Sequence, residues 1–121
     1  EVISRILSRR NIHKKSFDEN TVKSVEELIN CVDNAYQVMI DNLTAANKGD
    51  LTDISNAYNA EERINNLRNE LRDTEIEDIE NNRKNYQTSV YYLDIINQLE
   101  RMGDFIINIS QDLNRAYATK R

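Results

Sequence analysis

Residues 22–49 read VKSVEELINCVDNAYQVMIDNLTAANKG and carry apolar side chains every three or four positions along their whole length. This spacing places the apolar side chains on one face of an amphipathic helix. Ser16 followed by Glu19 is typical of a capping box near the start of such a helix. Gly49 is suited to the left-handed conformation that often follows a helix end. The apolar positions are Val22, Val25, Leu28, Ile29, Val32, Tyr36, Met39, Ile40, Leu43 and Ala46.

Two further runs of apolar residues with helical spacing follow, over residues 51–79 and 86–117. Asp50 is predicted to cap the second helix, with Asp53 favourable in its first turn. The chain is therefore predicted to be helical from the first run to its end.

The position of the second turn is open between two sites. Thr74 with Glu77 is a candidate capping box, which predicts a break near Asp73. The polar residues 81–85 are the other candidate. We favour residues 81–85 because this turn yields three helices of about 30 residues, each roughly 45 Å long, which bury their faces completely when antiparallel. The predicted fold class is all-α: an antiparallel up-down-up three-helix bundle over residues 17–121, preceded by a short basic lead-in, residues 1–16, that is open to being helical.

The composition excludes several other classes of protein. There is no proline and there are two glycines, Gly49 and Gly103, among 121 residues, which argues against a β-sandwich or barrel and against a glycine-rich phosphate loop. A single cysteine, Cys31, excludes an internal disulfide and an all-cysteine zinc site, and we expect a reduced, buried thiol. A single histidine, His13, excludes a multi-histidine metal site.

Charge is distributed unevenly along the chain. Residues 1–15 carry five basic side chains against one acidic one, a net charge of +4, and the remaining residues carry −9. The acidic body argues against binding of nucleic acid. The basic lead-in suits either an anionic partner such as a membrane surface or an ordinary solvated segment. No run of about 18 apolar residues is present. Because the chain opens with Glu1 rather than Met, we expect it to be a piece of a longer protein.

Four polar residues occupy positions where the bundle should be apolar. Glu61 and Asn65 fall within the apolar arc of the second helix when residues are placed 100° apart. Glu100 and Asp104 lie one turn apart on the apolar face of the third helix, on either side of Gly103. Two carboxylates placed in this way repel each other and lose hydration, so a cation, an arginine or solvent must compensate. Gly103 in turn suggests close approach of another backbone or of a ligand.

A hairpin that turns at residues 81–85 pairs these four residues at one level of the bundle. Asn65 would face Glu100, and Glu61 would face Asp104. Carboxylates from neighbouring helices are how helical bundles build metal sites, so we predict metal binding by Glu61, Asn65, Glu100 and Asp104. The alternative is neutralisation by an arginine of the same region. The candidate arginines are Arg63, Arg68 and Arg101.

The third helix resembles the signature of PhoU-like domains. Residues 92–104, YLDIINQLERMGD, and the following Asn108-Ile109 are similar to the family's Leu-Glu-Arg-Ile-Gly-Asp string and its Asn-Ile pair, with Met102 in place of Ile. Upstream, residues 61–67, EERINNL, resemble the family's acidic-x-x-Ile-Asp-x-Leu string. The resemblance covers roughly residues 20–118.

This resemblance implies a three-helix bundle and, as in some members, multinuclear metal binding through acidic-x-x-x-Asp motifs. Glu100 and Asp104 match one motif fully, and Glu61 matches the first position of the other. Asn65 stands where the family has Asp, which departs from the pattern. The resemblance implies iron or zinc as the metal.

PhoU-like domains occur as stand-alone phosphate-signalling regulators and as the cytoplasmic C-terminal part of bacterial sodium/phosphate cotransporters. This chain resembles the second group because it has one predicted bundle, does not begin with Met, and carries the sequence of residues 92–99 just before the Glu-Arg-x-Gly-Asp string. The resemblance implies a regulatory domain without catalysis at the cytoplasmic face of the cell membrane. Its partners would be the transmembrane portion of the same chain, a second copy and, for the basic lead-in, the membrane surface. The alternatives are a stand-alone regulator and a non-catalytic helical interaction module; a carboxylate-bridged metalloenzyme is disfavoured because such sites add histidines.

Overall fold

The computed structural model describes residues 17–50 and 53–120, and side chains as far as residue 116. These residues form three helices: α2 over Glu19–Asn47, α3 over Ser55–Glu80 and α4 over Tyr86–Lys120. None of the described helices has the length and hydropathy that crossing a bilayer requires. The basic lead-in, including His13, and Leu51 of the second apolar run lie outside the described residues.

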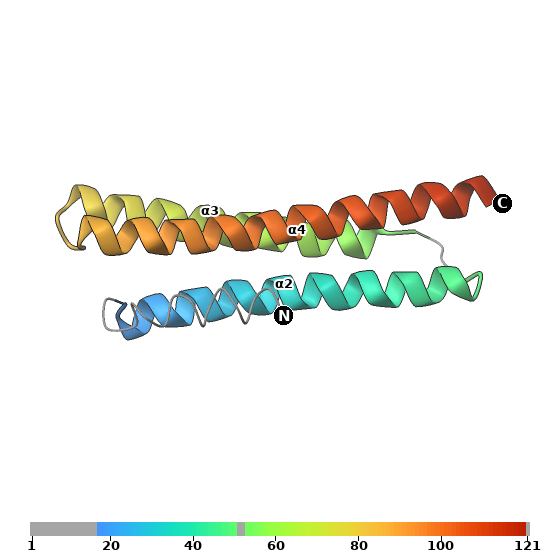
Figure 1. Cartoon of the computed structure of the whole chain (residues 1–121), viewed down its shortest axis with the longest axis horizontal. Coiled ribbons are helices and arrows are strands. Elements are labelled where there is room, and N and C mark those ends of the chain that lie inside the picture. Colours follow the sequence, from blue (N-terminus) through green and yellow to red (C-terminus); the bar gives the residue numbers. More distant parts are fainter. Residues whose placement is uncertain (1–16, 51–52, 121) are drawn as a thin grey trace.

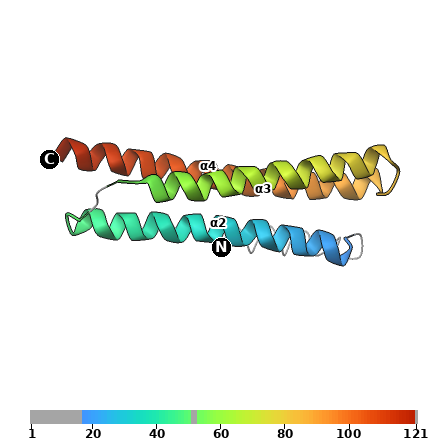
Figure 2. The same ribbon diagram turned by 180° about the vertical axis from the view of Figure 1, so that it is seen from behind.

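The helices are arranged as an antiparallel up-down-up bundle, which confirms the predicted fold class. Figure 1 and the reverse view in Figure 2 show α3 and α4 side by side in one layer and α2 in the layer below. Each helix packs against both of the others. The beginnings of α2 and α4 and the end of α3 therefore lie at one end of the bundle (Figure 1).

The second turn lies at residues 81–85, as favoured from the sequence, and Asp73 lies inside α3. Asn82 adopts a positive φ of 55° in this turn. Asn85 caps the start of α4, since its Oδ1 accepts a hydrogen bond from the Thr88 backbone N–H at 3.1 Å.

Two predictions about helix starts are wrong. The first is the Ser16–Glu19 capping box, because α2 is capped by Asp18. The Asp18 Oδ1 accepts a hydrogen bond from the Thr21 backbone N–H at 2.7 Å, and hydrogen bonding to Thr21 lowers the pKa of Asp18. Asp50 does not cap α3, which begins at Ser55 with Ile54 in the N-cap position; the Asp50 backbone N–H instead bonds to the Ala45 carbonyl at 2.8 Å and closes the end of α2. With Gly49 at a φ of 78° this is a Schellman ending, and α3 begins only at Ser55.

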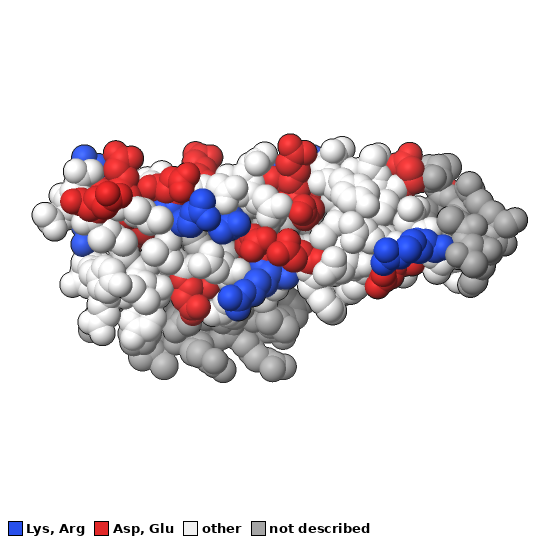
Figure 3. Space-filling model, turned by 90° about the horizontal axis from the view of Figure 1, so that it is seen from above, with Lys and Arg blue, Asp and Glu red and all other residues white. Residues whose placement is uncertain are grey.

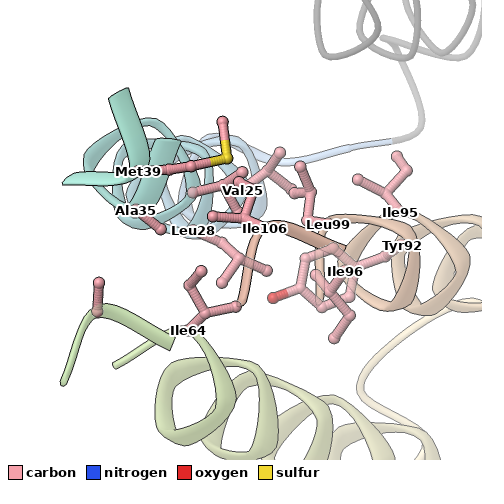
Figure 4. Close-up of a cluster of buried hydrophobic side chains, with 12 residues drawn as sticks. Val25, Leu28, Ala35, Met39, Ile64, Tyr92, Ile95, Ile96, Leu99 and Ile106 are labelled. Atoms are coloured by element: carbon pink, nitrogen blue, oxygen red, sulfur yellow. The ribbon is translucent and has the colours of Figure 1, made fainter. Parts of the chain in front are cut away.

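The main core is built from all three helices (Figure 4). Leu28, Ile64 and Ile96 are fully buried at its centre, each from a different helix. Cys31 was predicted to be buried and is only half-buried at the edge of this core, where desolvation raises the pKa of its thiol. The remaining buried members are Val25, Val32, Ala35, Met39, Ala60, Tyr92, Ile95, Leu99 and Ile106.

Gly103 allows α3 and α4 to approach closely. A Cβ placed on Gly103 would lie 2.8 Å from Ile64 Cδ1 and 3.3 Å from Ile64 Cγ2. The space that a side chain would take is therefore filled by Ile64, from the opposite helix. This contact brings together the two helix segments that carry the four predicted site residues.

Candidate functional site: an acidic cluster between α3 and α4

Glu61 and Asn65 form the α3 half of the candidate site. The Asn65 side-chain amide donates to both Glu61 carboxylate oxygens, at 2.8 Å and 3.1 Å. Both side chains are partly buried. The one-turn spacing predicted from the sequence thus becomes a direct contact, with the Asn65 N–H groups turned toward Glu61.

Glu100 and Asp104 form the α4 half, and both are partly buried. Burial raises the pKa of the Glu100 carboxyl, and hydrogen bonding to Asp104 and repulsion from its charge raise that pKa further. The Glu61 carboxylate adds to this increase, and Arg68 opposes it. Glu100 is therefore close enough to charges on both helices for them to affect its protonation. We call Glu61, Asn65, Glu100 and Asp104 the acidic cluster.

Two buried polar atoms at this cluster have no hydrogen-bond partner among the described residues. They are Asn65 Oδ1 and Arg68 Nε. A buried polar atom without a partner costs about 1–3 kcal/mol, so a native structure normally supplies one. Since the Asn65 amide N–H groups are used by Glu61, its free oxygen remains available to a cation or to another donor.

The described residues include no group of three or more His, Cys, Asp or Glu side chains that is already arranged to hold a metal ion. The structure thus joins Glu61 to Asn65 and Glu100 to Asp104, and couples the two halves electrostatically. Arg68 is the member of the three candidate arginines that acts on Glu100. Arg68 is thus close enough to the acidic cluster to offset part of its negative charge.

Figure 3 looks down on the layer formed by α3 and α4. On this face, Asp and Glu side chains outnumber Lys and Arg side chains and are interspersed with them. A face of this composition attracts cations, and screening by salt limits that attraction to short distances.

A second polar cluster, which the sequence analysis missed, lies at the end of the bundle near the α3–α4 turn. Glu75 is only 4% exposed, and its carboxylate accepts from Ser89 Oγ at 2.5 Å and from Lys84 Nζ at 3.1 Å. Lys84 Nζ also donates to Thr21 Oγ1 of α2 at 3.3 Å. One ion pair therefore ties all three segments of this end together. The available sequence signal is that Glu75 follows Leu71 by four residues and so continues the apolar face of α3.

A cavity of about 180 Å³ opens beside this second cluster. Phe17 and Tyr92 form part of its wall, and desolvation raises the pKa of the Tyr92 hydroxyl to about 12. Its charged lining residues are Asp18, Glu75, Arg83 and Lys84, so their formal charges cancel. This cavity is at the end of the bundle and is separate from the acidic cluster.

The raised pKa of Glu100 predicts how stability depends on pH. Between the ordinary pKa of about 4.5 and the higher value in the folded chain, the folded state binds more protons than the unfolded state. The free energy of unfolding should therefore fall as pH rises through this window and stay lower above it. Glu100→Gln should make the chain more stable than wild type at pH 7 and weaken this pH dependence. Urea unfolding from pH 4 to 8 tests this, with Glu62→Gln, an exposed carboxyl on α3, as the control; equal pH dependence in wild type and Glu100→Gln would contradict it.

Comparison with known protein families identifies the family of this chain. A family model described as the PhoU domain matches residues 25–113, a range that begins within α2 and ends within α4. No curated protein and no solved structure shows significant similarity to the chain. PhoU domains are non-catalytic regulatory domains made of helices and are typically cytoplasmic. Because the model spans well over half of the sequence, including all four residues of the acidic cluster, the chain belongs to the PhoU domain family.

Proposed function

We propose that the chain is the regulatory domain of a sodium-dependent phosphate cotransporter, held at the cytoplasmic face of the membrane. Membership of the PhoU family supports a phosphate-related regulatory role. The basic residues 1–15 support a position beside an anionic membrane surface, because Lys and Arg accumulate on the cytoplasmic side of membrane proteins. The transmembrane portion of the same chain would be the regulated partner.

We further propose that the acidic cluster binds a metal cation, iron or zinc, which would regulate the packing of the bundle. The observation that carries this proposal is the unpartnered Asn65 Oδ1 beside Glu61, with Glu100 and Asp104 opposite. The residue types suit a cation, because carboxylate and amide oxygens are metal ligands, but Glu61, Glu100 and Asp104 would have to move closer together to hold one. When bound, the cation would supply positive charge that relieves the repulsion between the carboxylates and links α3 to α4.

Metal binding is tested on the full chain by loading metal-free protein with iron or zinc, removing the excess and measuring the metal retained. Wild type should retain metal and melt at a higher temperature when loaded. Asp104→Asn should bind at least about tenfold more weakly. Glu62→Gln, an exposed position on the same helix as Glu61, should bind like wild type. Equal metal in wild type and Asp104→Asn would refute the site.

The cotransporter assignment is tested separately, on the complete gene product. Hydrophobic spans directly before residue 1 would support a cotransporter, whereas a second helical bundle without such spans would indicate a stand-alone phosphate regulator. In the complete protein, Glu100→Gln should alter phosphate uptake by cells without changing the amount of protein in the membrane. If Glu100→Gln loses its metal but phosphate uptake is unchanged, regulation through the cluster would be refuted, whereas the proposal of metal binding would stand.

A further inference from the structure

The cavity of about 180 Å³ lies where the start of α2 meets the α3–α4 turn, at the left end of the bundle in Figure 1. Sites for drug-sized ligands measure roughly 300–1,000 Å³, so this cavity suits a smaller molecule. Phe17 and Tyr92 supply aromatic parts of its wall, and Thr21 and Thr88 supply hydroxyl groups. One ligand could therefore meet apolar and polar groups at the same time.

The Glu75 side chain in this wall is already compensated within the protein. Its carboxylate is 4% exposed and accepts from Ser89 Oγ at 2.5 Å and from Lys84 Nζ at 3.1 Å. A buried network whose members are all paired holds its side chains in one arrangement. This part of the cavity wall is therefore in place before any ligand binds.

Two basic residues of the cavity lining have hydrogen-bonding capacity left. Lys84 Nζ uses two of its three N–H groups, on Glu75 and on Thr21. Arg83 pairs with Asp78 through Nη1, and its side chain is 61% exposed. Since a guanidinium carries five N–H groups, Arg83 can donate to a second acceptor. The lining thus offers cationic N–H donors to an acidic group of a ligand.

Asp18 places a carboxylate in the same lining. Its Oδ1 caps α2 by accepting from the Thr21 backbone N–H, and hydrogen bonding to Thr21 lowers the pKa of Asp18, so this carboxylate is charged at neutral pH. A carboxylate accepts about four hydrogen bonds, so the cap leaves room for another donor. A purely anionic ligand would be repelled by Asp18 and Glu75, and a purely cationic one by Arg83 and Lys84. A ligand that carries both charges avoids both costs.

We propose that this cavity binds a small free amino acid with an apolar side chain. The carboxylate of the ligand accepts from Lys84 and Arg83, its ammonium group donates to Asp18, and its side chain packs against Phe17 and Tyr92. The ligand then links the start of α2 to the α3–α4 turn and stabilises this end of the bundle. This inference goes beyond the proposed function and involves no residue of the acidic cluster.

Calorimetric titration of the full chain with L-valine tests the proposal, together with two analogues that each lack one charge. Isovalerate has no ammonium group, and isobutylamine has no carboxylate. L-Valine should bind and raise the melting temperature. Each analogue should bind at least about tenfold more weakly, because one charged part of the cavity loses its partner.

Two variants of the cavity lining test where the ligand binds. Asp18→Asn and Arg83→Met should each weaken the binding of L-valine at least about tenfold. Asparagine caps a helix as well as aspartate does, and Arg83 is largely exposed, so both variants should keep the helical circular dichroism of wild type. Asp33→Asn and Arg101→Met, at exposed positions outside the described lining of the cavity, should bind like wild type.

Three results would overturn the proposal. If L-valine neither binds in calorimetry nor raises the melting temperature, the cavity is not a site for such an amino acid. If isovalerate binds as tightly as L-valine and Asp18→Asn has no effect, the cavity binds simple anions. If Arg101→Met weakens binding as much as Arg83→Met, the ligand binds elsewhere on the molecule.

Discussion

Lys84→Met is expected to lower the free energy of unfolding by about 3 kcal/mol, because it leaves the buried Glu75 carboxylate without its cation. Glu75 is nearly inaccessible to water, and Lys84 Nζ at 3.1 Å is its ion-pair partner. Methionine keeps the length of the lysine stem, so the loss reports mainly on charge. Denaturant unfolding followed by circular dichroism measures the change.

The neighbouring Arg83 provides the matched control. Arg83 pairs with Asp78 at 3.2 Å, but its side chain is 61% exposed, so Arg83→Met should cost less than about 1 kcal/mol. Glu75→Gln in the Lys84→Met background should restore most of the lost stability, because the amide is neutral and still accepts from Ser89. A cost for Lys84→Met no greater than that for Arg83→Met would show that the buried pair contributes little.

Ile64→Ala is expected to destabilise the bundle by about 3–4 kcal/mol, since Ile64 is fully buried at the crossing of α3 and α4. The cavity left behind faces Gly103, which has no side chain to fill it. Ile76→Ala, at a 39% exposed position of α3, should change stability by less than about 1 kcal/mol. Thermal and urea unfolding of both variants measure the difference.

The contact between Gly103 and Ile64 predicts that Gly103→Ala destabilises wild type but stabilises the Ile64→Ala variant. In wild type the new Cβ would lie 2.8 Å from Ile64 Cδ1, so overpacking should outweigh the gain in helix propensity of about 1 kcal/mol. In the Ile64→Ala background the same methyl group should fill space and restore part of the stability. Additive effects of the two substitutions would contradict the close contact seen in the structure.

The three helices and the second turn could be predicted from the sequence because they depend on local patterns. Apolar residues at helical spacing recur over each helix, and the polar residues 81–85 interrupt them. The start of α3 could not be predicted, because the backbone of Asp50 is already used to close α2 at Ala45. The residue type at one position does not show whether it belongs to the end of one helix or to the start of the next.

The acidic cluster could be predicted in part. The spacing of Glu100 and Asp104 on one helix face follows from helix geometry, and so does that of Glu61 and Asn65. That the Asn65 amide turns its N–H groups toward Glu61, and that Arg68 acts on Glu100, depend on rotamers and on the approach of α3 to α4. Metal binding at this cluster stays a prediction.

By itself, the amino-acid sequence determined that this chain is helical, where its apolar faces run and which helix turn carries each carboxylate, because each of these follows from the 3.6-residue period. Only the tertiary structure decided that Ile64 fills the space at Gly103 and that Lys84 reaches the buried Glu75. The physical reason is that packing between helices depends on side-chain volume and helix approach in three dimensions, and residues far apart along the chain meet only after the bundle forms.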